Sequence, residues 1–166
     1  MDIKMNEQQK KYYEESGLWT DRTLNDYWNE AVRRFGDREY IVDDFGRRYT
    51  YSEMDEKANV LASWMKKQGI KAGDMVSLQC TPRSEFVIIV YACIKLGAVI
   101  VPMKMRTGAA EWVRLMKMVK SRLHFCLETY HGEDMAPFIL SNEKELGYEL
   151  TNVYIGLDKK FEKGYD

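Results

Sequence analysis

Hydrophobic residues follow two different spacings along this chain, and each spacing predicts a type of element. Over residues 24–35 and 51–68, apolar side chains recur every three or four positions, which is typical of helices that bury one face. Thr23 precedes the first of these segments as an N-cap residue does. Thr50 and Glu53 have the spacing of a capping box at the start of the second.

Other patterns occur around these two helices. Residues 6–16 are hydrophilic and predict a surface helix. Residues 37–51 predict a β-hairpin, with strands at 40–43 and 48–51 on either side of a turn at Gly46.

From residue 75 onward, continuous apolar runs alternate with helical patterns. The predicted strands are 75–80, 97–101, 123–129 and 152–157, and the predicted helices are 84–97, 107–122 with Thr107 as N-cap, and 134–147. Such alternation is typical of a parallel sheet with right-handed crossovers, and continuous apolar strands are buried on both faces. The predicted fold is therefore α/β, with a doubly wound, mostly parallel sheet and flanking helices, preceded by an N-terminal helix and a β-hairpin.

These patterns divide the chain into four parts. Residues 1–36 form an N-terminal helical leader, residues 37–51 the hairpin, and residues 52–158 the α/β subdomain. Residues 159–166 are polar and predict a tail or linker at a point of truncation.

The composition excludes some classes of function. The 166 residues carry 25 basic and 26 acidic side chains, a formal net charge of −1, so no basic excess points to nucleic-acid binding. The longest apolar stretch, residues 86–102, is interrupted by Lys95 and Gly97 and is shorter than the ~20 residues that a transmembrane helix requires. The N-terminus has no apolar segment typical of a signal peptide, so we expect a cytoplasmic protein.

Cysteine and histidine positions do not point to a metal site. Cys80, Cys93 and Cys126 are widely spaced within apolar runs, which predicts reduced core thiols. His124 and His131 have no neighbouring ligand at a metal-binding spacing, so we expect them to be structural or exposed.

Ligands of open parallel sheets bind beyond the carboxyl ends of the strands, which directs attention to residues 81–83, 103–108 and 129–134. None of these loops contains a glycine-rich phosphate motif, and no nucleophile or metalloprotease motif occurs elsewhere. We therefore assign no catalytic residue and no ATP-binding residue to this chain.

Lys104 and Arg106 are the candidate binding residues. They follow a predicted strand and precede the start of a predicted helix, where a phosphate can be held by cations and backbone N–H groups. Arginine suits this task because its planar fork forms paired, charge-assisted hydrogen bonds. The alternative is a solvated arginine, or one that pairs with Glu111.

Beyond these patterns, the ordered string of residues resembles a known family. GRRYTYSEMDEKANVLASWMKKQGIKAGDMVSLQC, followed by SEFVIIVYACIKLGAVIVPMKMRTGAAEWVRLM, resembles the N-terminal part of the acyl- and aryl-adenylate-forming superfamily. The shared features include T-Y-x-E-x-D, G-D-x-V and K-x-G-A-V-x-V-P. The upstream YYEESGLWTDRTLNDYW is similar to short- and medium-chain fatty acyl-CoA synthetases and to siderophore-type aryl-acid ligases. The resemblance extends over about residues 6–158.

The resemblance implies an AMP-forming acid–thiol ligase that uses ATP, Mg²⁺ and CoA. Such an enzyme converts a small carboxylic acid and ATP to an acyl-adenylate and pyrophosphate, then transfers the acyl group to the CoA thiol. Its ATP loop, rich in Ser, Thr and Gly and ending in P-K-G, and its catalytic lysine follow the region present here. The resemblance therefore implies an N-terminal fragment that is inactive alone.

The resemblance also implies a role for Arg106. In CoA ligases of this family, the loop after the G-A-V-x-x-P strand often presents an arginine, as in N-P-R, and in some members it contacts the CoA nucleotide phosphate. Arg106 occupies that place, with Lys104 beside it, whereas Met103-Lys104-Met105 departs from the asparagine–proline lead-in.

Two alternatives remain open. The chain is a fragment of an aryl-acid–AMP ligase, or it is a stand-alone, non-catalytic α/β binding module. A fragment is expected to expose apolar surface and to self-associate, whereas a module is expected to be a compact monomer.

Overall fold

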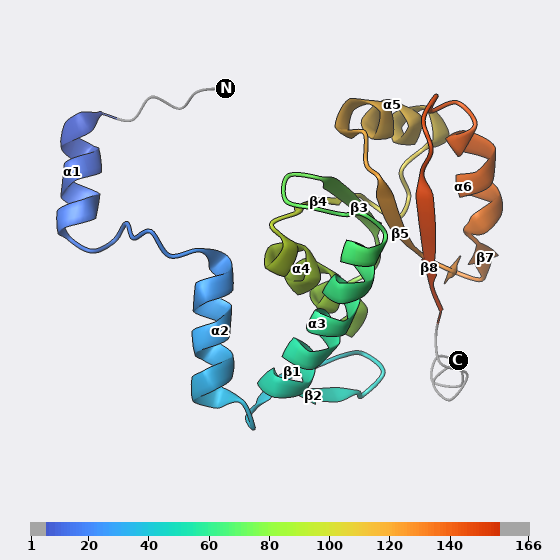
Figure 1. Ribbon diagram of the computed structural model, residues 1–166. Helices are drawn as coiled ribbons and strands as arrows, with labels where there is room; N and C mark the ends of the chain where they lie inside the picture. The colour runs from blue at the N-terminus through green and yellow to red at the C-terminus, as the bar shows by residue number, and fades with distance from the viewer. Residues whose placement is uncertain (1–5, 157–166) are drawn as a thin grey trace.

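A computed structural model describes residues 6–156 of the chain (Figure 1). Its centre is a four-stranded parallel sheet in the order β4-β3-β5-β8. The strands are β3 (Met75–Gln79), β4 (Val99–Pro102), β5 (Leu123–Leu127) and β8 (Thr151–Ile155). The α/β fold with a parallel sheet and flanking helices, predicted from the sequence, is confirmed. The predicted tail at 159–166 and the end of the predicted last strand, residue 157, lie outside the described residues.

The strand order places the topological switch between β3 and β5. The chain leaves β3 through α4 (Ser84–Leu96) to reach β4 at the edge, crosses through α5 (Ala109–Val119) to β5, and continues through α6 (Ala136–Glu143) to β8. In Figure 1, α3 and α4 lie on one face of the sheet, and α5 and α6 lie on the other. The carboxyl ends of neighbouring strands therefore send their loops to opposite faces.

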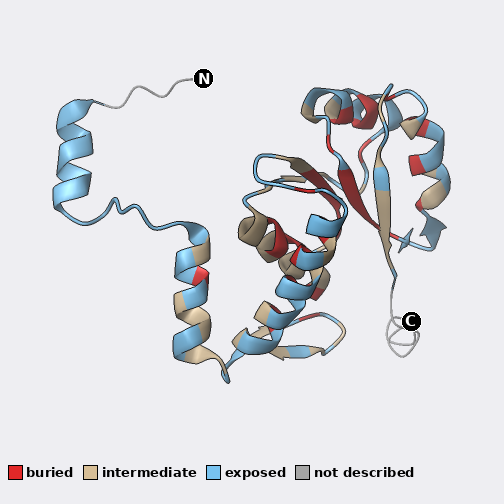
Figure 2. Cartoon of the chain, in the orientation of Figure 1, coloured by how far each residue is buried: buried red, intermediate tan, exposed pale blue. Residues whose placement is uncertain are grey.

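Two hydrophobic clusters hold the helices to the sheet. On one face, Val76, Leu78 and Phe125 pack in a cluster with buried residues of α3 and α4. On the other face, Trp112 of α5 and Ile139 of α6 pack in a cluster with Cys126. Figure 2 shows this burial in the central strands and on the inward sides of the helices. β3 and β5 are thus covered on both faces, as their sequences predicted.

The N-terminal elements also follow the sequence pattern. They are α1 (Glu7–Glu15), α2 (Leu24–Phe35), β1 (Glu39–Val42), β2 (Arg48–Thr50) and α3 (Tyr51–Lys67). Both predicted caps form: the Thr23 hydroxyl accepts from the Asp26 amide, and the Thr50 hydroxyl accepts from the Glu53 amide, each with the reciprocal carboxylate contact of a capping box. The polar helix α1 has no buried residue.

The predicted bounds of β4, α5 and α6 differ from those in the structure: β4 begins at Val99 and ends at Pro102, instead of spanning 97–101. Thr107 does not cap α5; Gly108 is the N-cap, and the helix ends at Val119 because Lys120 adopts a left-handed backbone with φ 49°. Pro137 lies in the first turn of α6, which begins at Ala136 and is shorter than predicted.

A further difference is in the predicted loop 129–134, which forms a small hairpin. Its strands are β6 (Thr129–Tyr130) and β7 (Glu133–Asp134). His131 and Gly132 turn the chain with φ values of 52° and 77°, the pair of positive angles that a type I′ turn needs.

No helix among residues 6–156 is long and apolar enough to cross a membrane.

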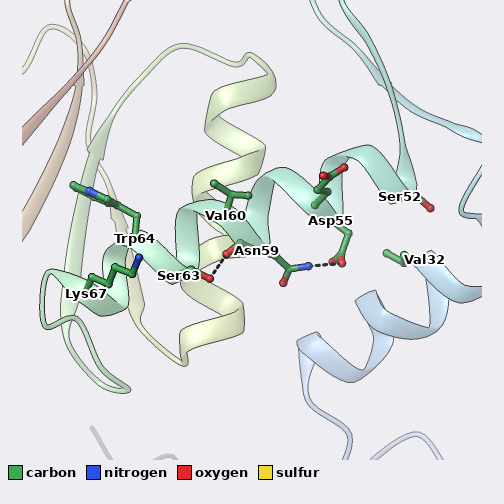
Figure 3. A pocket seen from close by; sticks show the side chains of 9 residues that line it. Val32, Ser52, Asp55, Asn59, Val60, Ser63, Trp64 and Lys67 are labelled. Carbon is green, nitrogen blue, oxygen red and sulfur yellow. Dashed lines mark hydrogen bonds between the residues drawn. The ribbon is translucent and has the colours of Figure 1, made fainter.

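The carboxylate of Asp55 on α3 connects three helices, α2, α3 and α4. The Asp55 carboxylate accepts hydrogen bonds from Trp28 Nε1 of α2 at 2.6 Å and from Asn59 Nδ2 at 2.8 Å, and lies 2.7 Å from Lys95 Nζ of α4. Figure 3 shows the Asp55–Asn59 bond on the outer surface of α3. Burial opposes ionisation of Asp55, but the bonds from Lys95 and Trp28 outweigh it and lower its pKa below the usual value.

Replacing this carboxylate tests how much it contributes to the stability of the fold. Asp55→Ala leaves the Lys95 ammonium, whose side chain is only 12% exposed, without a counter-charge. We expect the free energy of unfolding to fall by about 2 kcal/mol, less than the cost of breaking a fully buried pair because both side chains are partly exposed. Urea denaturation measures this change. Asp37→Ala removes an exposed carboxylate and should change stability by less than about 0.5 kcal/mol. Equal losses in the two variants would contradict the role of the pair.

Candidate functional site

A pocket opens where the loops after β4 and β5 meet, beyond the carboxyl ends of the parallel strands. Its volume is about 490 Å³. It is lined by Met105, Arg106 and Thr107 on one side and by Tyr130, His131, Glu133, Asp134, Met135 and Phe138 on the other. Two of the three loops singled out in the sequence, 103–108 and 129–134, are therefore brought together. The third, 81–83, does not line this pocket.

The loop after β4 alternates between inward and outward side chains. Pro102 is the last residue of the edge strand, and the Met103 amide donates to the Leu78 carbonyl at 2.8 Å, which carries the ladder one residue further. Met105 is partly buried against both hydrophobic clusters, whereas Lys104 and Arg106 are exposed. Because the apolar side chains anchor this loop, the two cations project into solvent.

Arg106 and Lys104 differ in their surroundings. Arg106 lines the pocket, and Lys104 does not. Among residues 6–156, neither cation forms an ion pair, so the pairing of Arg106 with Glu111, which the sequence left open, is absent there. Arg106 is thus available to an anionic ligand.

The opposite wall of the pocket has a different chemistry. Glu133 and Asp134 can accept hydrogen bonds from a ligand's hydroxyl or amino groups. The Tyr130 and Phe138 rings supply apolar surface, and the His131 ring contacts Tyr130 with centroids 4.3 Å apart. The arrangement suits a ligand that combines an anionic group with a polar or ring-shaped part.

Gln79, which the sequence analysis did not single out, connects the loop to the sheet. Its Nε2 donates to the Lys104 carbonyl at 2.8 Å, and its Oε1 accepts from Trp112 Nε1 of α5 at 2.9 Å. The signal in the sequence is an amide inside the apolar strand MVSLQC, since a buried polar group in a strand needs partners.

A second buried polar contact lies on the same strand. Ser77 Oγ lies 2.8 Å from His124 Nδ1 of β5, and the His124 side chain is 0% exposed. Burial lowers the pKa of His124 to about 4, so the imidazole is neutral near pH 7. His124 is therefore a structural histidine, as predicted. His131, the other histidine, is exposed.

The cysteines are also structural. Cys80, Cys93 and Cys126 are free and buried, and burial raises the pKa of each thiol to about 12. Such thiols are poor nucleophiles because the thiolate is the reactive form. The prediction of core thiols is confirmed.

A larger groove lies along the outer surface of α3, away from the strand ends (Figure 3). Its volume is about 660 Å³, and Val60, Trp64 and Lys67 are among the residues that line it. Its half-buried carboxylate, Asp55, already binds Lys95 and Trp28, and its other polar side chains, such as Glu56, are exposed on the helix surface. In the described part of the chain, no group of three or more His, Cys, Asp or Glu side chains could hold a metal ion.

The sequence is similar to those of known proteins. The profile of a family described as AMP-binding enzyme matches residues 28–163. The chain is 34% identical over 157 residues to a medium-chain fatty-acid–CoA ligase of Escherichia coli (strain K12), covering 95% of the chain and 27% of that relative. It is 26% identical over 122 residues to a 2,3-dihydroxybenzoate–AMP ligase of Bacillus subtilis (strain 168), covering 74% and 22%. The chain thus spans about a quarter of the length of these relatives.

Solved structures share the fold. The anthranilate CoA ligase AuaEII, in complex with anthranoyl-AMP, superimposes with a TM-score of 0.74 at 19% identity, over 84% of this chain and 26% of that one. A luciferase-like enzyme from the nonluminescent Zophobas morio mealworm gives a TM-score of 0.73 at 21% identity, over 84% and 32%.

The buried imidazole makes stability depend on pH. The pKa of His124 is about 4 when folded against an ordinary 6.5, so the unfolded chain binds the extra proton between these values. The free energy of unfolding should therefore fall by roughly 3 kcal/mol as the pH drops from 6.5 to 4.

His124→Gln should remove this part of the pH dependence, because the amide does not titrate. Urea denaturation at several pH values measures the effect. The matched variant His131→Gln, which changes the exposed histidine, should keep the dependence. An unchanged pH profile in His124→Gln would show that another group is responsible.

Proposed function

Because the chain belongs to the AMP-binding enzyme family, we propose that it is the N-terminal part of an AMP-forming fatty acid–CoA ligase. The proposed parent enzyme joins a fatty acid to ATP, releasing pyrophosphate and forming an acyl-adenylate. It then transfers the acyl group to the CoA thiol and releases AMP. The family match supports the adenylate-forming chemistry, and the medium-chain ligase relative supports a fatty acid as substrate.

The surroundings of Arg106 support the proposal that CoA is a ligand. Its guanidinium is exposed, lines the pocket beyond the sheet and has no ion-pair partner among residues 6–156. The geometry fits a phosphate, since a planar guanidinium donates two parallel hydrogen bonds to phosphate oxygens. Lys104, two residues earlier, is also exposed and adds positive charge to the loop. We propose Arg106 as the main contact to a CoA phosphate and Lys104 as the weaker one.

ATP and Mg²⁺ are proposed for the parent enzyme, not for residues of this chain. The sequence contains no Ser/Thr/Gly-rich loop ending in P-K-G, and no metal-binding group of side chains occurs in the part that the structure describes. We therefore propose that the 166-residue chain supplies no catalytic residue and is inactive alone.

An aryl acid is the second candidate substrate. It is favoured by the similarity to a 2,3-dihydroxybenzoate–AMP ligase, but this relative matches less of the chain, at lower identity, than the fatty-acid ligase does. Acid-dependent ATP–pyrophosphate exchange with octanoate and with salicylate separates the two. Exchange with neither acid, in the protein that the complete source gene encodes, would favour a non-catalytic module.

Changing Arg106 tests the CoA contact. In the protein encoded by the complete source gene, Arg106→Ala should raise KM for CoA about tenfold, the worth of one charge-assisted contact. The rate of ATP–pyrophosphate exchange should stay the same, because adenylation precedes CoA binding. Arg114→Ala, which removes the same charge from an exposed position on α5, should change neither quantity. Equal losses in exchange and in CoA transfer would contradict the assignment.

A further inference from the structure

We propose that Gln79 is a positioning residue for Arg106: its side-chain amide fixes the loop 103–108 over the end of β3 and so sets where Arg106 meets its ligand. The identity of that ligand, a CoA phosphate, rests on the proposed function. The positioning of the loop stands on the geometry alone.

The amide of Gln79 has only one orientation that satisfies both neighbours. Gln79 is the last residue of β3, and its side chain is 0% exposed. The indole N–H of Trp112 can only donate, and the Lys104 carbonyl can only accept. Gln79 Oε1 must therefore face Trp112, and Nε2 must face Lys104, as observed at 2.9 and 2.8 Å. The amide connects β3 to α5 and to the loop that precedes α5.

The Lys104 carbonyl is the point at which the loop is held. Besides the Gln79 amide, it accepts a hydrogen bond from Thr107 Oγ1 at 2.7 Å and one from the Thr107 backbone amide at 3.3 Å. The bonds from Thr107 close a turn that contains Arg106, and the bond from Gln79 fixes that turn to the sheet. Thr107 serves this turn instead of capping α5, which explains why the predicted cap does not form.

No other contact with the sheet holds the Lys104 carbonyl among the described residues. The Met103 amide bonds to the Leu78 carbonyl at the start of the loop, before Lys104. Met105 packs against the two hydrophobic clusters and keeps the loop near the sheet, but apolar contacts are not directional. Without the Gln79 donor, the Lys104 carbonyl loses its only bond to the sheet among the contacts of the described residues. The direction in which Arg106 projects is then less restricted, while the fold is retained.

Amide hydrogen exchange on the 166-residue chain tests the positioning directly. Gln79→Met keeps the side-chain length but removes both the donor to Lys104 and the acceptor for Trp112, and should speed exchange of the Thr107 amide about tenfold. Ser77→Ala is the matched control, because it also removes a buried polar group from β3 on the side facing His124. It should leave exchange at Thr107 unchanged. Equal exchange at Thr107 in Gln79→Met and wild type would overturn the proposal.

Gln79→Glu provides a second variant of the same shape, should the methionine variant not fold. An ionised carboxylate places an acceptor against the Lys104 carbonyl, whereas the protonated acid donates to it again. Protection of the Thr107 amide should therefore rise, relative to wild type, as the pH is lowered. If the ratio of Thr107 amide protection in Gln79→Glu to that in wild type is the same at every pH, the proposal is contradicted.

Kinetics in the complete enzyme separate this proposal from the assignment of CoA. Gln79→Met should raise KM for CoA about tenfold with ATP–pyrophosphate exchange unchanged, since a small misplacement of a binding group is costly. In an Arg106→Ala background the same change should add less than about twofold, because the two residues act as one unit. If Arg106→Ala raises KM but Gln79→Met does not, the positioning role is wrong. If Arg106→Ala leaves KM unchanged while Gln79→Met loosens the loop, the CoA assignment is wrong and the positioning role stands.

Discussion

β3 lies between β4 and β5, and the two faces of this one strand determine how the rest of the chain is arranged. Val76 and Leu78 point to the α3 and α4 layer, where they join the apolar cluster. Ser77 and Gln79 point to the other face, where they bind His124 and Trp112. Side chains alternate between the faces of a strand, so a shift of one residue would place the polar pair in the apolar layer. The register of β3 is therefore strongly specified, and with it the positions of both neighbouring strands.

The same strand order produces the candidate site. β4 is an edge strand, and its proline is tolerated there because an edge position needs fewer ladder donors. The chain then crosses from the end of β4 to α5 on the far face, past the end of β3, where Gln79 holds it. The loop after β5 reaches the same edge and closes the pocket opposite Arg106. Neither loop forms the site alone; parallel pairing brings them together.

Features set by neighbouring residues were predictable from the sequence, and features set by distant residues were not. The capping boxes at Thr23 and Thr50 involve residues three positions apart, so the starts of α2 and α3 were correctly predicted. The start of α5 was not, because the Thr107 hydroxyl is engaged by the Lys104 carbonyl in a turn that Gln79, far away in the sequence, holds in place. The location of the candidate loops was predicted from the sheet topology, whereas Gln79 itself was missed. The division at residues 36, 51 and 158 remains a prediction.

The buried hydrogen bonds of Gln79, Ser77 and His124 lower the stability of the fold relative to a purely apolar core. Each buried amide, hydroxyl or imidazole loses its hydration and regains only part of that free energy through its partner. Hydrophobic contacts would hold α5 to the sheet equally well, as those of α3 and α4 do on the opposite face. They would not fix the direction of a backbone carbonyl, because only hydrogen bonds are directional. The amide of Gln79 is therefore best understood as a cost in stability that fixes one loop, and the loop that it fixes presents Arg106.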